Sequence, residues 1–403
     1  MSRPLHAVLL PPAAAASRLL EALPAALDGT GPALLPLDPG LPGARLAELV
    51  GAFAPSVIET AEGAERVSPA DRAAAPDQGP SVPAAGDDVA VVIATSGSTG
   101  RPKGAELSAA ALLASARASL ERIGARPGDR WLCCLPTFHM AGLGVLVRSL
   151  LAGADPVVTS RLDAGILAAS GCAYVSAVPT QLRRLLDSGA PLPALRTILL
   201  GGAAPPAGLL ADAAAADAPV VTTYGMSETC GGCVYDGVPL RGVSVDVGPD
   251  SLIRIAGPVL FSGYRLRPEA TAGVLADGWF RTSDLGSFDA AGRLMVRGRA
   301  TDVIITGGEK VVAAEVEAAL ETYRGVRDVA VVGVPDREWG ERVIALVVPA
   351  DPAAPPALAA LAAHVRAQLP GYAAPRALKL VTDIPLLASG KPDRRELRKM
   401  GSR

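Results

Sequence analysis

Short apolar runs rich in β-branched residues alternate along the chain with longer stretches rich in Ala and Leu. The apolar runs lie at 88–95, 172–178, 195–200 and 218–224, and the stretches of helical composition lie at 108–123, 180–187 and 207–216. Parallel strands that are buried on both faces are apolar throughout and are joined by helices. The alternation therefore predicts α/β architecture with mixed, largely parallel sheets.

The pattern changes near residue 235. Shorter candidate strands bounded by glycines follow (VSVDV, SLIRIAG and GRLMVRGR), and they predict an antiparallel, barrel-like β subregion. After Arg299 the chain again mixes apolar runs with helical stretches over about 100 residues, which is enough for a domain of its own. The sequence thus predicts a large N-terminal α/β domain, residues 1–298, and a small α+β C-terminal domain, residues 303–403, with the boundary at 298–302.

Two segments fall outside this alternation. Residues 60–87 combine low hydrophobicity with many Gly, Pro and Asp residues, so they are predicted to form a loop or linker. The first twenty residues resemble a secretory signal, with a basic residue, an apolar stretch and then small residues. Pro11 and Pro12 interrupt that stretch, and an apolar strand followed by an Ala-rich helix explains the same pattern. We favour the strand and helix.

The charge balance limits the classes of partner. The 403 residues include 38 Lys and Arg and 40 Asp and Glu, a formal net charge of −2, so no basic surface for nucleic acid or acidic membranes is indicated. Aromatic residues, which could stack on bases, make up only 3%. No apolar run approaches the about 18–20 residues that cross a bilayer. We expect small-molecule substrates, no nucleic acid and no membrane insertion, and the composition leaves a homodimer open.

The cysteines point to a reducing compartment. An odd number without a regular framework indicates reduced thiols in the cytoplasm. Two of them form a single Cys-x-x-Cys pair, but the three histidines lie far away in sequence, so a zinc site is not expected. The five residues are Cys133, Cys134, Cys172, Cys230 and Cys233.

A stretch rich in Gly and hydroxyl side chains, TSGSTGRPKG, covers residues 95–104 between a predicted strand and a predicted helix. Backbone N–H groups in such a strand–turn–helix context can bind an anion. Gly97 and Gly100 allow close approach, and Lys103 adds positive charge. The spacing is not that of a P-loop, since Lys103 follows Gly100 by three residues and Gly104 stands where a hydroxyl is required. We predict a phosphate site, against the alternative of a solvated turn.

Two later stretches could hold the rest of a nucleotide. LLGGAAPP (199–206) has two glycines after a predicted strand, where a flat ring can lie against the backbone; a plain strand-to-helix turn is the alternative. In TTYGMSETCGG, Tyr224 can stack on a base, and Ser227 or Thr229 can bond to phosphate. Glu228 can hold Mg²⁺ through hard carboxylate oxygens. An ordinary loop is the alternative here too.

Three stretches towards the C-terminus carry isolated charges. In GWFRTSDLG, Asp284 can accept hydrogen bonds from both hydroxyls of a ribose, or it can cap a turn. GRATDVIITGGEKV supplies Arg299 at the domain boundary and a Gly307-Gly308 loop. In IPLLASGKPDRREL, Lys391 precedes a proline that keeps it extended, and a solvated lysine is the alternative.

The order and combination of these motifs resemble the acyl- and aryl-adenylate-forming superfamily, which includes acyl-CoA synthetases, luciferases and the adenylation domains of peptide synthetases. TSGSTGRPKG, YGMSET, GWFRTSDLG and GRATDVI carry the resemblance, which runs from about Val89 to Lys391. Members use ATP and Mg²⁺ to transfer AMP to a carboxylate. The resemblance implies an AMP-forming acid–thiol ligase that uses coenzyme A, with a mobile C-terminal domain and a hinge at 299–302. Thr301 stands where members often have an acidic hinge residue.

The resemblance also implies a role for each matching residue. Lys391 would reach the α-phosphate and carboxylate oxygens during adenylation, and Glu228 would hold Mg²⁺. Gly307 and Gly308 would line the tunnel for coenzyme A. The residues implied in ATP or AMP binding are Thr95, Ser96, Gly97, Ser98, Thr99, Gly100, Lys103, Gly202, Ala203, Tyr224, Gly225, Met226, Ser227, Asp284 and Arg299.

The stretch HMAGLGVLVRSLLAG bears on the acid substrate. His139 stands where the superfamily has an aromatic residue or a histidine that gates the acyl pocket, which implies a catalytic or acid-binding role; a structural histidine is the alternative. Arg148 lies inside an otherwise apolar predicted helix, where an unpaired cation is costly. It either extends to the surface or pairs with a second carboxylate on the substrate.

The pattern HxxGLxxLxRSxxxG, together with VPTQLRRLL and YGMSETCGGCVYDGVPL, is similar to that of the o-succinylbenzoate–CoA ligases of menaquinone biosynthesis. This likeness implies an acid with a second, aromatic carboxylate. The alternatives are another aryl- or acyl-CoA ligase, a peptide-synthetase adenylation domain, and a non-catalytic nucleotide-binding protein. The end of the sequence at residue 403 argues against the second, and the presence of Glu228 and Lys391 argues against the third.

Overall fold

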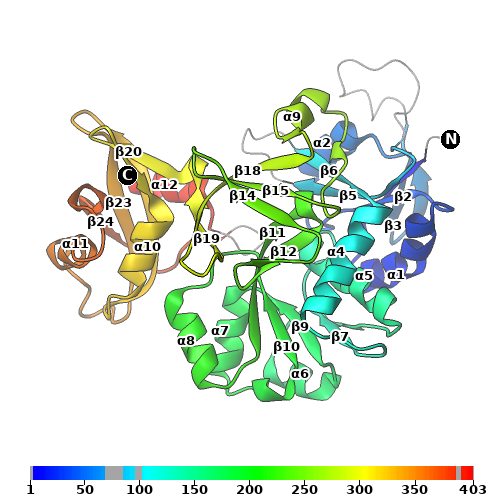
Figure 1. Ribbon diagram of the computed structural model, residues 1–403, viewed down its shortest axis with the longest axis horizontal. Helices are drawn as coiled ribbons and strands as arrows, with labels where there is room; N and C mark the ends of the chain where they lie inside the picture. The colour runs from blue at the N-terminus through cyan, green and yellow to red at the C-terminus, as the bar shows by residue number, and fades with distance from the viewer. Residues whose placement is uncertain (1–2, 69–84, 96–101, 387–391, 403) are drawn as a thin grey trace.

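The computed structural model describes residues 3–68, 85–95, 102–386 and 392–402. A small C-terminal domain, coloured yellow to red in Figure 1, lies beside a large domain that contains three sheets. The predicted fold class is confirmed: sheets and helices are mixed in the large domain, and a small α+β domain follows it.

The first sheet has seven strands in the order β16-β6-β5-β2-β1-β3-β4. Its centre is parallel, and β4, β6 and β16 are added antiparallel. Its first strand is followed by an Ala-rich helix, as in the interpretation favoured for the N-terminus. The strands are β1 (Leu5–Val8), β2 (Ala33–Pro36), β3 (Val57–Thr60), β4 (Gly63–Arg66), β5 (Val89–Thr95), β6 (Lys103–Ser108) and β16 (Gly263–Tyr264).

The second sheet also has seven strands, in the order β13-β12-β11-β10-β9-β7-β8. Strands β7 to β11 pair in parallel, and β12 and β13 are added antiparallel. All residues of β9 and β10 are buried, as their apolar sequences predict. The strands are β7 (Trp131–Cys133), β8 (Val157–Val158), β9 (Tyr174–Ala177), β10 (Thr197–Leu200), β11 (Val220–Met226), β12 (Gly231–Tyr235) and β13 (Val238–Pro239).

Helices of the large domain begin and end at residues suited to these positions. The Ser108 side chain accepts a hydrogen bond from the backbone N–H of Ala111 and so caps α4. Gly153 ends α5 in a left-handed conformation. The helices are α1 (Pro12–Asp28), α2 (Gly43–Phe53), α4 (Ala109–Arg122), α5 (Met140–Ala152), α6 (Ala164–Ser170), α7 (Pro179–Asp187), α8 (Ala207–Ala215) and α9 (Pro268–Ala272).

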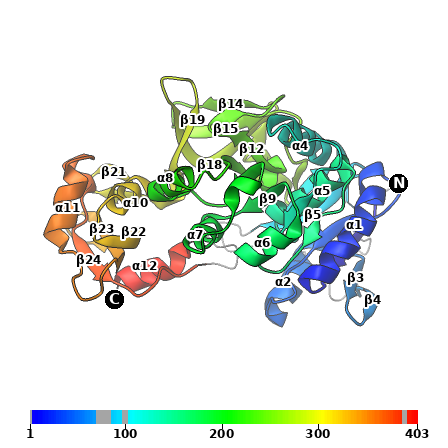
Figure 2. The ribbon, with the colours of Figure 1, turned by 90° about the horizontal axis from the view of Figure 1, so that it is seen from below.

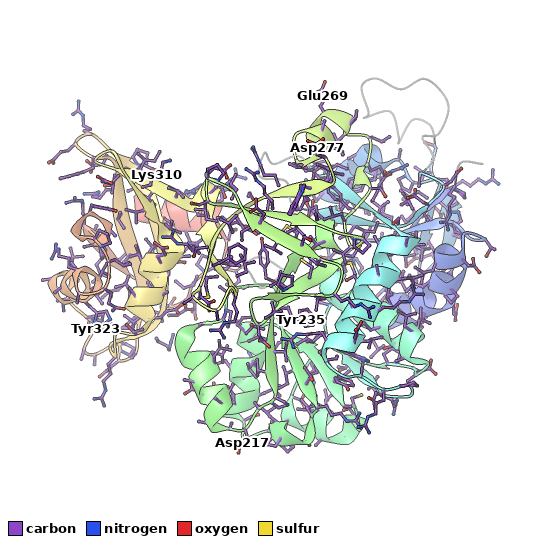
Figure 3. All side chains as sticks on the ribbon, viewed as in Figure 1. Asp217, Tyr235, Glu269, Asp277, Lys310 and Tyr323 are labelled. Atoms are coloured by element: carbon purple, nitrogen blue, oxygen red, sulfur yellow. The ribbon has the colours of Figure 1, made fainter. Side chains whose placement is uncertain are left out.

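One apolar core joins the two seven-stranded sheets. Helices α1, α4 and α5 pack against one another, and their buried residues form a continuous cluster with residues of β5, β7 and β12. Figure 2 shows these helices together at one side of the molecule. Tyr235 of β12 is buried in this core (Figure 3), and its hydroxyl lies 2.7 Å from that of Ser119 on α4.

The third sheet is antiparallel, in the order β14-β15-β18-β17, with β19 paired to β18. The antiparallel part of the sequence prediction is confirmed. Within the described residues the sheet is open, because its edge strands β14 and β17 pair with no further strand. The strands are β14 (Ser244–Val247), β15 (Leu252–Ala256), β17 (Leu275–Ala276), β18 (Trp279–Phe288) and β19 (Leu294–Arg299).

The C-terminal domain is a mixed sheet with its own core. The strand order is β21-β20-β23-β22, with β24 parallel to β23, and helices α10 and α11 contribute to one apolar cluster of this domain. The elements are β20 (Val303–Thr306), β21 (Glu309–Val312), α10 (Ala313–Glu321), β22 (Val326–Asp336), β23 (Gly340–Pro349), α11 (Leu358–Arg366), β24 (Ala377–Leu380) and α12 (Arg394–Ser402).

Three further observations bear on the sequence predictions. The loop predicted for 60–87 is wrong at its beginning, because residues 63–66 form β4, which pairs antiparallel with β3 through a tight turn. All five cysteines are buried free thiols, as predicted. No described helix is both long enough and apolar enough to cross a membrane.

Candidate active site

Part of the predicted site lies outside the described residues. The predicted site residues concerned are Ser96, Gly97, Ser98, Thr99, Gly100 and Lys391. The geometry of the site therefore comes from the candidates on β5, β6, β11, β18 and β19, from the turns that follow β10 and β11, and from helix α5.

The predicted phosphate loop joins two antiparallel strands. Lys103 stands opposite Thr95 in the β5–β6 pair, and Oγ1 of Thr95 donates a hydrogen bond of 3.2 Å to the Lys103 carbonyl. The predicted strand–turn–helix context is wrong, because the whole of β6 separates the loop from α4. Strand β6 runs so close to Val92 and Phe53 that a Cβ atom at position 104 would lie only 2.9 Å from Val92 and 3.0 Å from Phe53. Glycine, which has no Cβ atom, allows this approach.

A tyrosine that sequence reasoning missed connects two of the predicted residues. Nζ of Lys103 lies 4.6 Å from the centre of the Tyr264 ring, and the Tyr264 hydroxyl donates a hydrogen bond of 2.8 Å to Oε1 of Glu228. Burial, and then the Glu228 carboxylate, raise the pKa of Tyr264, so its hydroxyl stays protonated and donates. The candidate phosphate lysine and the candidate metal ligand therefore share one neighbour.

Glu228 suits a magnesium ion that arrives with a nucleotide. Among the described residues no three or more His, Cys, Asp or Glu side chains gather as a metal site. Mg²⁺ retains several waters and is commonly held by one or two carboxylates together with substrate phosphates. Glu228 lies in the partly exposed turn η2 (Ser227–Thr229), and its Oε2 atom has no hydrogen bond to a described residue. The donor set fits a metal–nucleotide complex.

Tyr224, Asp284 and Arg299 meet at the point where β11 approaches β18 and β19. The Tyr224 hydroxyl donates a hydrogen bond of 2.9 Å to Oδ2 of Asp284, and Nε of Arg299 lies 3.2 Å from Oδ1 of the same carboxylate. The Asp284 side chain is 9% exposed and that of Arg299 is 53% exposed. Burial, and then Asp284, raise the pKa of Tyr224. Three residues from distant motifs thus form one connected group.

Small residues keep the backbone accessible beside this group. Gly202 follows β10 with a φ of 85°, which glycine adopts easily, and the partly buried Ala203 comes next. Strands β10 and β11 pair in parallel, so this turn lies beside the end of β11. There a Cβ atom on Gly225 would lie 2.0 Å from the carbonyl oxygen of Gly231. Glycine is therefore required at 225 for β11 and β12 to pair.

The turn after β11 distinguishes the two hydroxyls proposed for phosphate. Thr229 is buried, and its Oγ1 accepts a hydrogen bond from the Met226 N–H at 2.9 Å and donates to the Gly231 carbonyl at 2.7 Å. Ser227 is partly exposed. Thr229 therefore maintains the turn, and Ser227 is the hydroxyl open to a ligand.

Arg148 is a half-buried cation inside the large domain. Its guanidinium carbon lies 4.4 Å from the centre of the Trp131 ring, and Nη2 donates a hydrogen bond of 3.0 Å to Oγ of Ser176. Its Nε atom is buried without a hydrogen-bond partner, and no ion pair joins it to a carboxylate in the described parts of the chain. Burial lowers the pKa of Arg148, although a guanidinium remains charged at neutral pH. Arg148 thus keeps one donor unused within the described residues.

His139 lies at the other end of the same helix. It is the N-cap residue of α5, and its ring lies edge-on to Phe138 with 4.6 Å between the ring centres. Arg148 lies nine positions further along the chain, which corresponds to about 14 Å along a helix. The structure does not bring these two candidates for acid binding into contact.

The Gly307-Gly308 loop is a two-residue hairpin turn between β20 and β21. Both glycines have positive φ, 59° and 85°, as such turns require. The Gly307 N–H donates a hydrogen bond of 2.8 Å to the Trp339 carbonyl, and a Cβ atom on Gly307 would lie 3.0 Å from the Trp339 ring. Within the described residues, no hydrogen bond or ion pair links this turn to Tyr224 or Glu228.

The predicted boundary at 298–302 has contacts on both of its sides. Arg299 ends β19 opposite Asp284 in β18. Asp302 belongs to the small domain, because its carboxylate oxygens lie 3.6 Å from Nε of Arg394 and 3.6 Å from Nη2 of Arg398, both on α12. Arg398 also donates a hydrogen bond of 3.1 Å to the Thr301 carbonyl.

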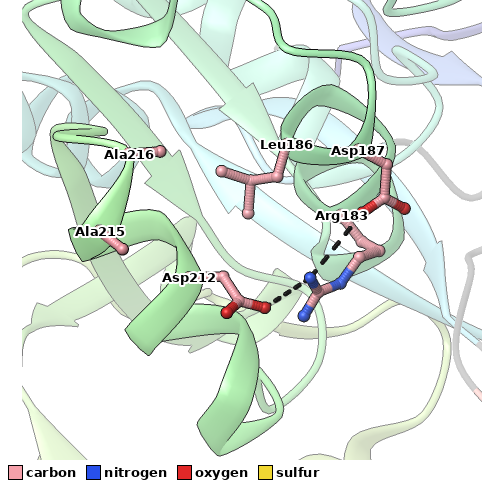
Figure 4. Close-up of a pocket in the computed structure, with 6 residues that line it drawn as sticks. All are labelled: Arg183, Leu186, Asp187, Asp212, Ala215 and Ala216. Carbon is pink, nitrogen blue, oxygen red and sulfur yellow. Dashed lines mark hydrogen bonds and ion pairs between the residues drawn. The ribbon is translucent and has the colours of Figure 1, made fainter.

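A surface groove between α7 and α8 contains none of the predicted site residues. Figure 4 shows Arg183 between two carboxylates, those of Asp187 and Asp212, so the charges in the groove are already paired. It offers no group for nucleotide chemistry. Its lining residues are Arg183, Leu186, Asp187, Asp212, Ala215 and Ala216.

Sequence profiles decide the family. The profile of the AMP-binding enzymes matches residues 22–299, more than half of the chain, and that of the AMP-binding enzyme C-terminal domain matches residues 315–391. The chain belongs to the AMP-binding enzyme family. The two matched segments correspond to the large and small domains, and the Arg299–Asp302 boundary described above begins where the first match ends.

Two relatives among AMP-binding enzymes differ in their acids. The chain is 47% identical over 325 residues to a probable 2-succinylbenzoate–CoA ligase from Mycobacterium tuberculosis, and the match covers 77% of this chain and 84% of the relative. It is 37% identical over 365 residues to a feruloyl-CoA synthase from Amycolatopsis sp., with 83% and 74% covered.

Solved structures of AMP-binding enzymes share the fold along almost the whole chain. The o-succinylbenzoate CoA synthetase MenE from Bacillus subtilis, in complex with the acyl-adenylate intermediate OSB-AMP, superposes with a TM-score of 0.83 at 27% identity, covering 98% of this chain and 88% of that one. The same enzyme in complex with ATP and magnesium ion gives a TM-score of 0.81 at 26% identity, covering 98% and 89%.

Proposed function

We propose that this AMP-binding enzyme is a 2-succinylbenzoate–CoA ligase, which uses ATP, Mg²⁺ and coenzyme A and serves menaquinone biosynthesis. Two similar proteins, from Mycobacterium tuberculosis and Bacillus subtilis, carry the name of this activity. The five buried free thiols support action in the reducing cytoplasm.

In the first half-reaction, a substrate carboxylate oxygen attacks the α-phosphorus of ATP. The new P–O bond gives the acyl-adenylate, and the bond to the β-phosphate breaks to release pyrophosphate. The Tyr224–Asp284–Arg299 group holds the base and ribose, Ser227 contacts the α-phosphate, and Lys391 neutralises the oxygens that react. Glu228 would hold Mg²⁺, which would neutralise phosphate charge there. Lys103 binds the departing pyrophosphate.

In the second half-reaction, the thiol sulfur of coenzyme A attacks the acyl carbon. AMP leaves with the bonding electron pair of the C–O bond, and the thiol proton is released. This step requires that Lys391 withdraws and that the Gly307-Gly308 turn approaches the acyl-adenylate, which a rotation of the small domain about 299–302 provides. Thr301 lacks the charge often found at this hinge, but a hinge needs permissive dihedral angles rather than charge.

Arg148 is the single observation that carries the choice of acid. It is a half-buried cation with a buried, unused Nε donor and no carboxylate partner among the described residues. 2-Succinylbenzoate has two carboxylates, one on the succinyl chain and one on the ring. We propose that the ring carboxylate pairs with Arg148 while the succinyl carboxylate reacts, because a charge-assisted bond in a dry site is strong and directional.

A ligase for another aromatic acid is the second candidate, since the feruloyl-CoA synthase relative matches a larger share of the chain than the ligase relative does. Ferulate carries a single carboxylate, so it leaves Arg148 unpaired. Pyrophosphate release with ATP and Mg²⁺ is the deciding assay, run with 2-succinylbenzoate, ferulate, benzoate and 4-oxo-4-phenylbutanoate. The last compound is 2-succinylbenzoate without its ring carboxylate.

The proposal requires that 2-succinylbenzoate gives the highest kcat/KM and that mass spectrometry detects its CoA thioester when coenzyme A is added. A higher kcat/KM for ferulate would transfer the assignment to the second candidate. Equal values for 2-succinylbenzoate and 4-oxo-4-phenylbutanoate would remove the proposed role of Arg148.

A further inference from the structure

We propose that Tyr264 is a positioning residue of the metal–nucleotide site: its hydroxyl fixes one carboxylate oxygen of Glu228, and its ring restrains the ammonium group of Lys103. The inference rests on the proposed use of Mg²⁺ and ATP. It adds a residue from β16, outside the predicted motifs, that connects the phosphate loop with the metal ligand.

The backbone around Tyr264 is held firmly enough to aim its side chain. Tyr264 pairs with Ala105 of β6, and its N–H donates a hydrogen bond of 2.8 Å to Oγ1 of Thr271 in α9. The preceding Gly263 has a φ of 154°, and a Cβ atom there would lie 2.9 Å from the Thr271 methyl group. Glycine is therefore needed before the tyrosine for this segment to pack against α9.

The same segment also holds the backbone of the metal ligand. The Phe261 N–H donates a hydrogen bond of 2.9 Å to the Glu228 carbonyl. The Phe261 ring lies edge-on to the Tyr264 ring, with 4.9 Å between their centres. Glu228 is thus contacted twice from residues 261–264, once at its carbonyl and once at its carboxylate.

The hydroxyl of Tyr264 selects which carboxylate oxygen is available. It occupies Oε1 of Glu228, and Oε2 has no hydrogen bond to a described residue. A carboxylate that is fixed through one oxygen presents the other in a defined direction, which lowers the conformational entropy lost when a ligand binds. A Tyr264→Phe variant loses this bond and keeps the ring.

The ring acts on the lysine of the phosphate loop. An ammonium group 4.6 Å from a tyrosine ring centre is within the range of cation–π attraction. The long side chain of Lys103 therefore has a resting position beside the Tyr264 ring. A Tyr264→Leu variant loses both effects, so the two substitutions separate the hydroxyl from the ring.

The test measures binding without turnover. ATP is titrated into the full-length protein by calorimetry in the absence of any acid substrate, at a series of free Mg²⁺ concentrations and in excess chelator. Tyr264→Phe should raise the Mg²⁺ concentration for half-maximal stimulation of ATP binding by about tenfold, as expected for a lost hydrogen bond to a charged group. Its ATP affinity in chelator should be unchanged. Tyr264→Leu should in addition weaken ATP binding in chelator.

Tyr174→Phe is the matched control. Tyr174 also donates a hydrogen bond to a carboxylate, 3.2 Å from Oδ2 of Asp129, but neither residue belongs to the predicted site. This variant should keep the wild-type Mg²⁺ dependence. The thermal midpoint of each variant is measured alongside, so that a change in binding is compared between folded proteins.

Three results would overturn the inference. The first is a Tyr264→Phe variant with unchanged or tighter Mg²⁺ dependence, and the second is an equal loss of ATP affinity with and without metal. The third is a tenfold effect of Tyr264→Phe that persists in a Glu228→Gln background, because the hydroxyl would then not act through Glu228. A wild-type protein that binds no ATP with Mg²⁺ would instead refute the proposed function, and this inference with it.

Discussion

Replacing Arg148 with methionine should separate substrate binding from stability. A fully buried cation without an ion-pair partner costs several kcal/mol in desolvation, and the half-buried Arg148 costs less than that. Contact with the Trp131 ring stabilises the Arg148 guanidinium by about 0.5–2 kcal/mol. The hydrogen bond to Ser176 stabilises it by about 1.5–3 kcal/mol. These contributions nearly cancel, and methionine fills a similar volume. We therefore expect the thermal midpoint of Arg148→Met to stay within about 2 °C of the wild type.

The effect on binding should be large and specific to the dianion. Loss of a charge-assisted bond to the ring carboxylate should raise KM for 2-succinylbenzoate by about 10- to 100-fold, or about 1.4–2.7 kcal/mol. KM for 4-oxo-4-phenylbutanoate should change little, because that acid has no ring carboxylate. Arg148→Met should therefore lose most of the preference of the wild type for the dianion.

Pyrophosphate release with both acids measures the two effects, and a melting curve measures stability. Arg183→Met is the matched control, since Arg183 is paired with Asp212 at the surface between α7 and α8. The reasoning fails if Arg148→Met lowers the thermal midpoint by many degrees and leaves both KM values unchanged. Arg148 would then be a structural residue.

Further predictions concern the nucleotide group, the β11–β12 pair and the buried thiols. Tyr224→Phe removes the donor to Asp284 and should raise KM for ATP about five- to tenfold, and an unchanged KM in steady-state kinetics would contradict this role. Gly225→Ala forces a Cβ atom against the Gly231 carbonyl, so urea denaturation should reveal a loss of about 1–3 kcal/mol. Burial raises the pKa of the Cys133 thiol in the folded protein to about 11, whereas the unfolded thiol ionises near pH 8.5. The stability that the protonated Cys133 thiol contributes is therefore fully present below pH 8.5 and is lost as pH rises towards 11. The free energy of unfolding measured between pH 8 and 10.5 should therefore fall less steeply in a Cys133→Ala variant.

Elements with a strong local pattern were predictable from the sequence. Strands β5, β9 and β10 and helices α4 and α8 fall within the predicted ranges, because apolar runs and Ala-rich stretches reflect local burial. Strand β11 continues two residues beyond its predicted range, and helix α7 begins one residue before its own. Strand β6 was not predicted. Its residues, 103–108, begin with Lys103 and Gly104 and contain no strong apolar run. Their pairing with β5 depends on the absence of a side chain at Gly104, beside Phe53 of α2.

Only the site residues that belong to recognisable motifs were predictable from the sequence. Motif order pointed to Tyr224, Asp284 and Arg299, and the structure joins them by one hydrogen bond and one ion pair. Tyr264 could not be found in this way, because its contacts with Glu228 and Lys103 span long sequence separations and its own stretch has the composition of an ordinary strand and turn. The sequence offered one signal for Tyr264: a glycine directly before an aromatic residue, followed by a helix that begins with proline.

For Arg148 the sequence revealed the anomaly but not its surroundings. A single cation in an apolar helix is visible in the sequence, whereas its stacking on Trp131 and its bond to Ser176 depend on the packing of α5 against β7 and β9. The same limit applies to Thr229, whose hydroxyl proved to be used by backbone groups of its own turn.

The two sets of bonds at the domain boundary leave very little chain between them. Arg299 is paired within the large domain, whereas Asp302 and the Thr301 carbonyl are bonded to α12 of the small one, so the link between the two sets of bonds is only Ala300 and Thr301. Two residues supply about four soft backbone torsions. An exposed ion pair between Arg297 and Glu315 bridges the domains nearby, and such pairs contribute about 0–1 kcal/mol. The rotation proposed for the small domain would therefore take place about a very short pivot, and proline at position 301 should block it.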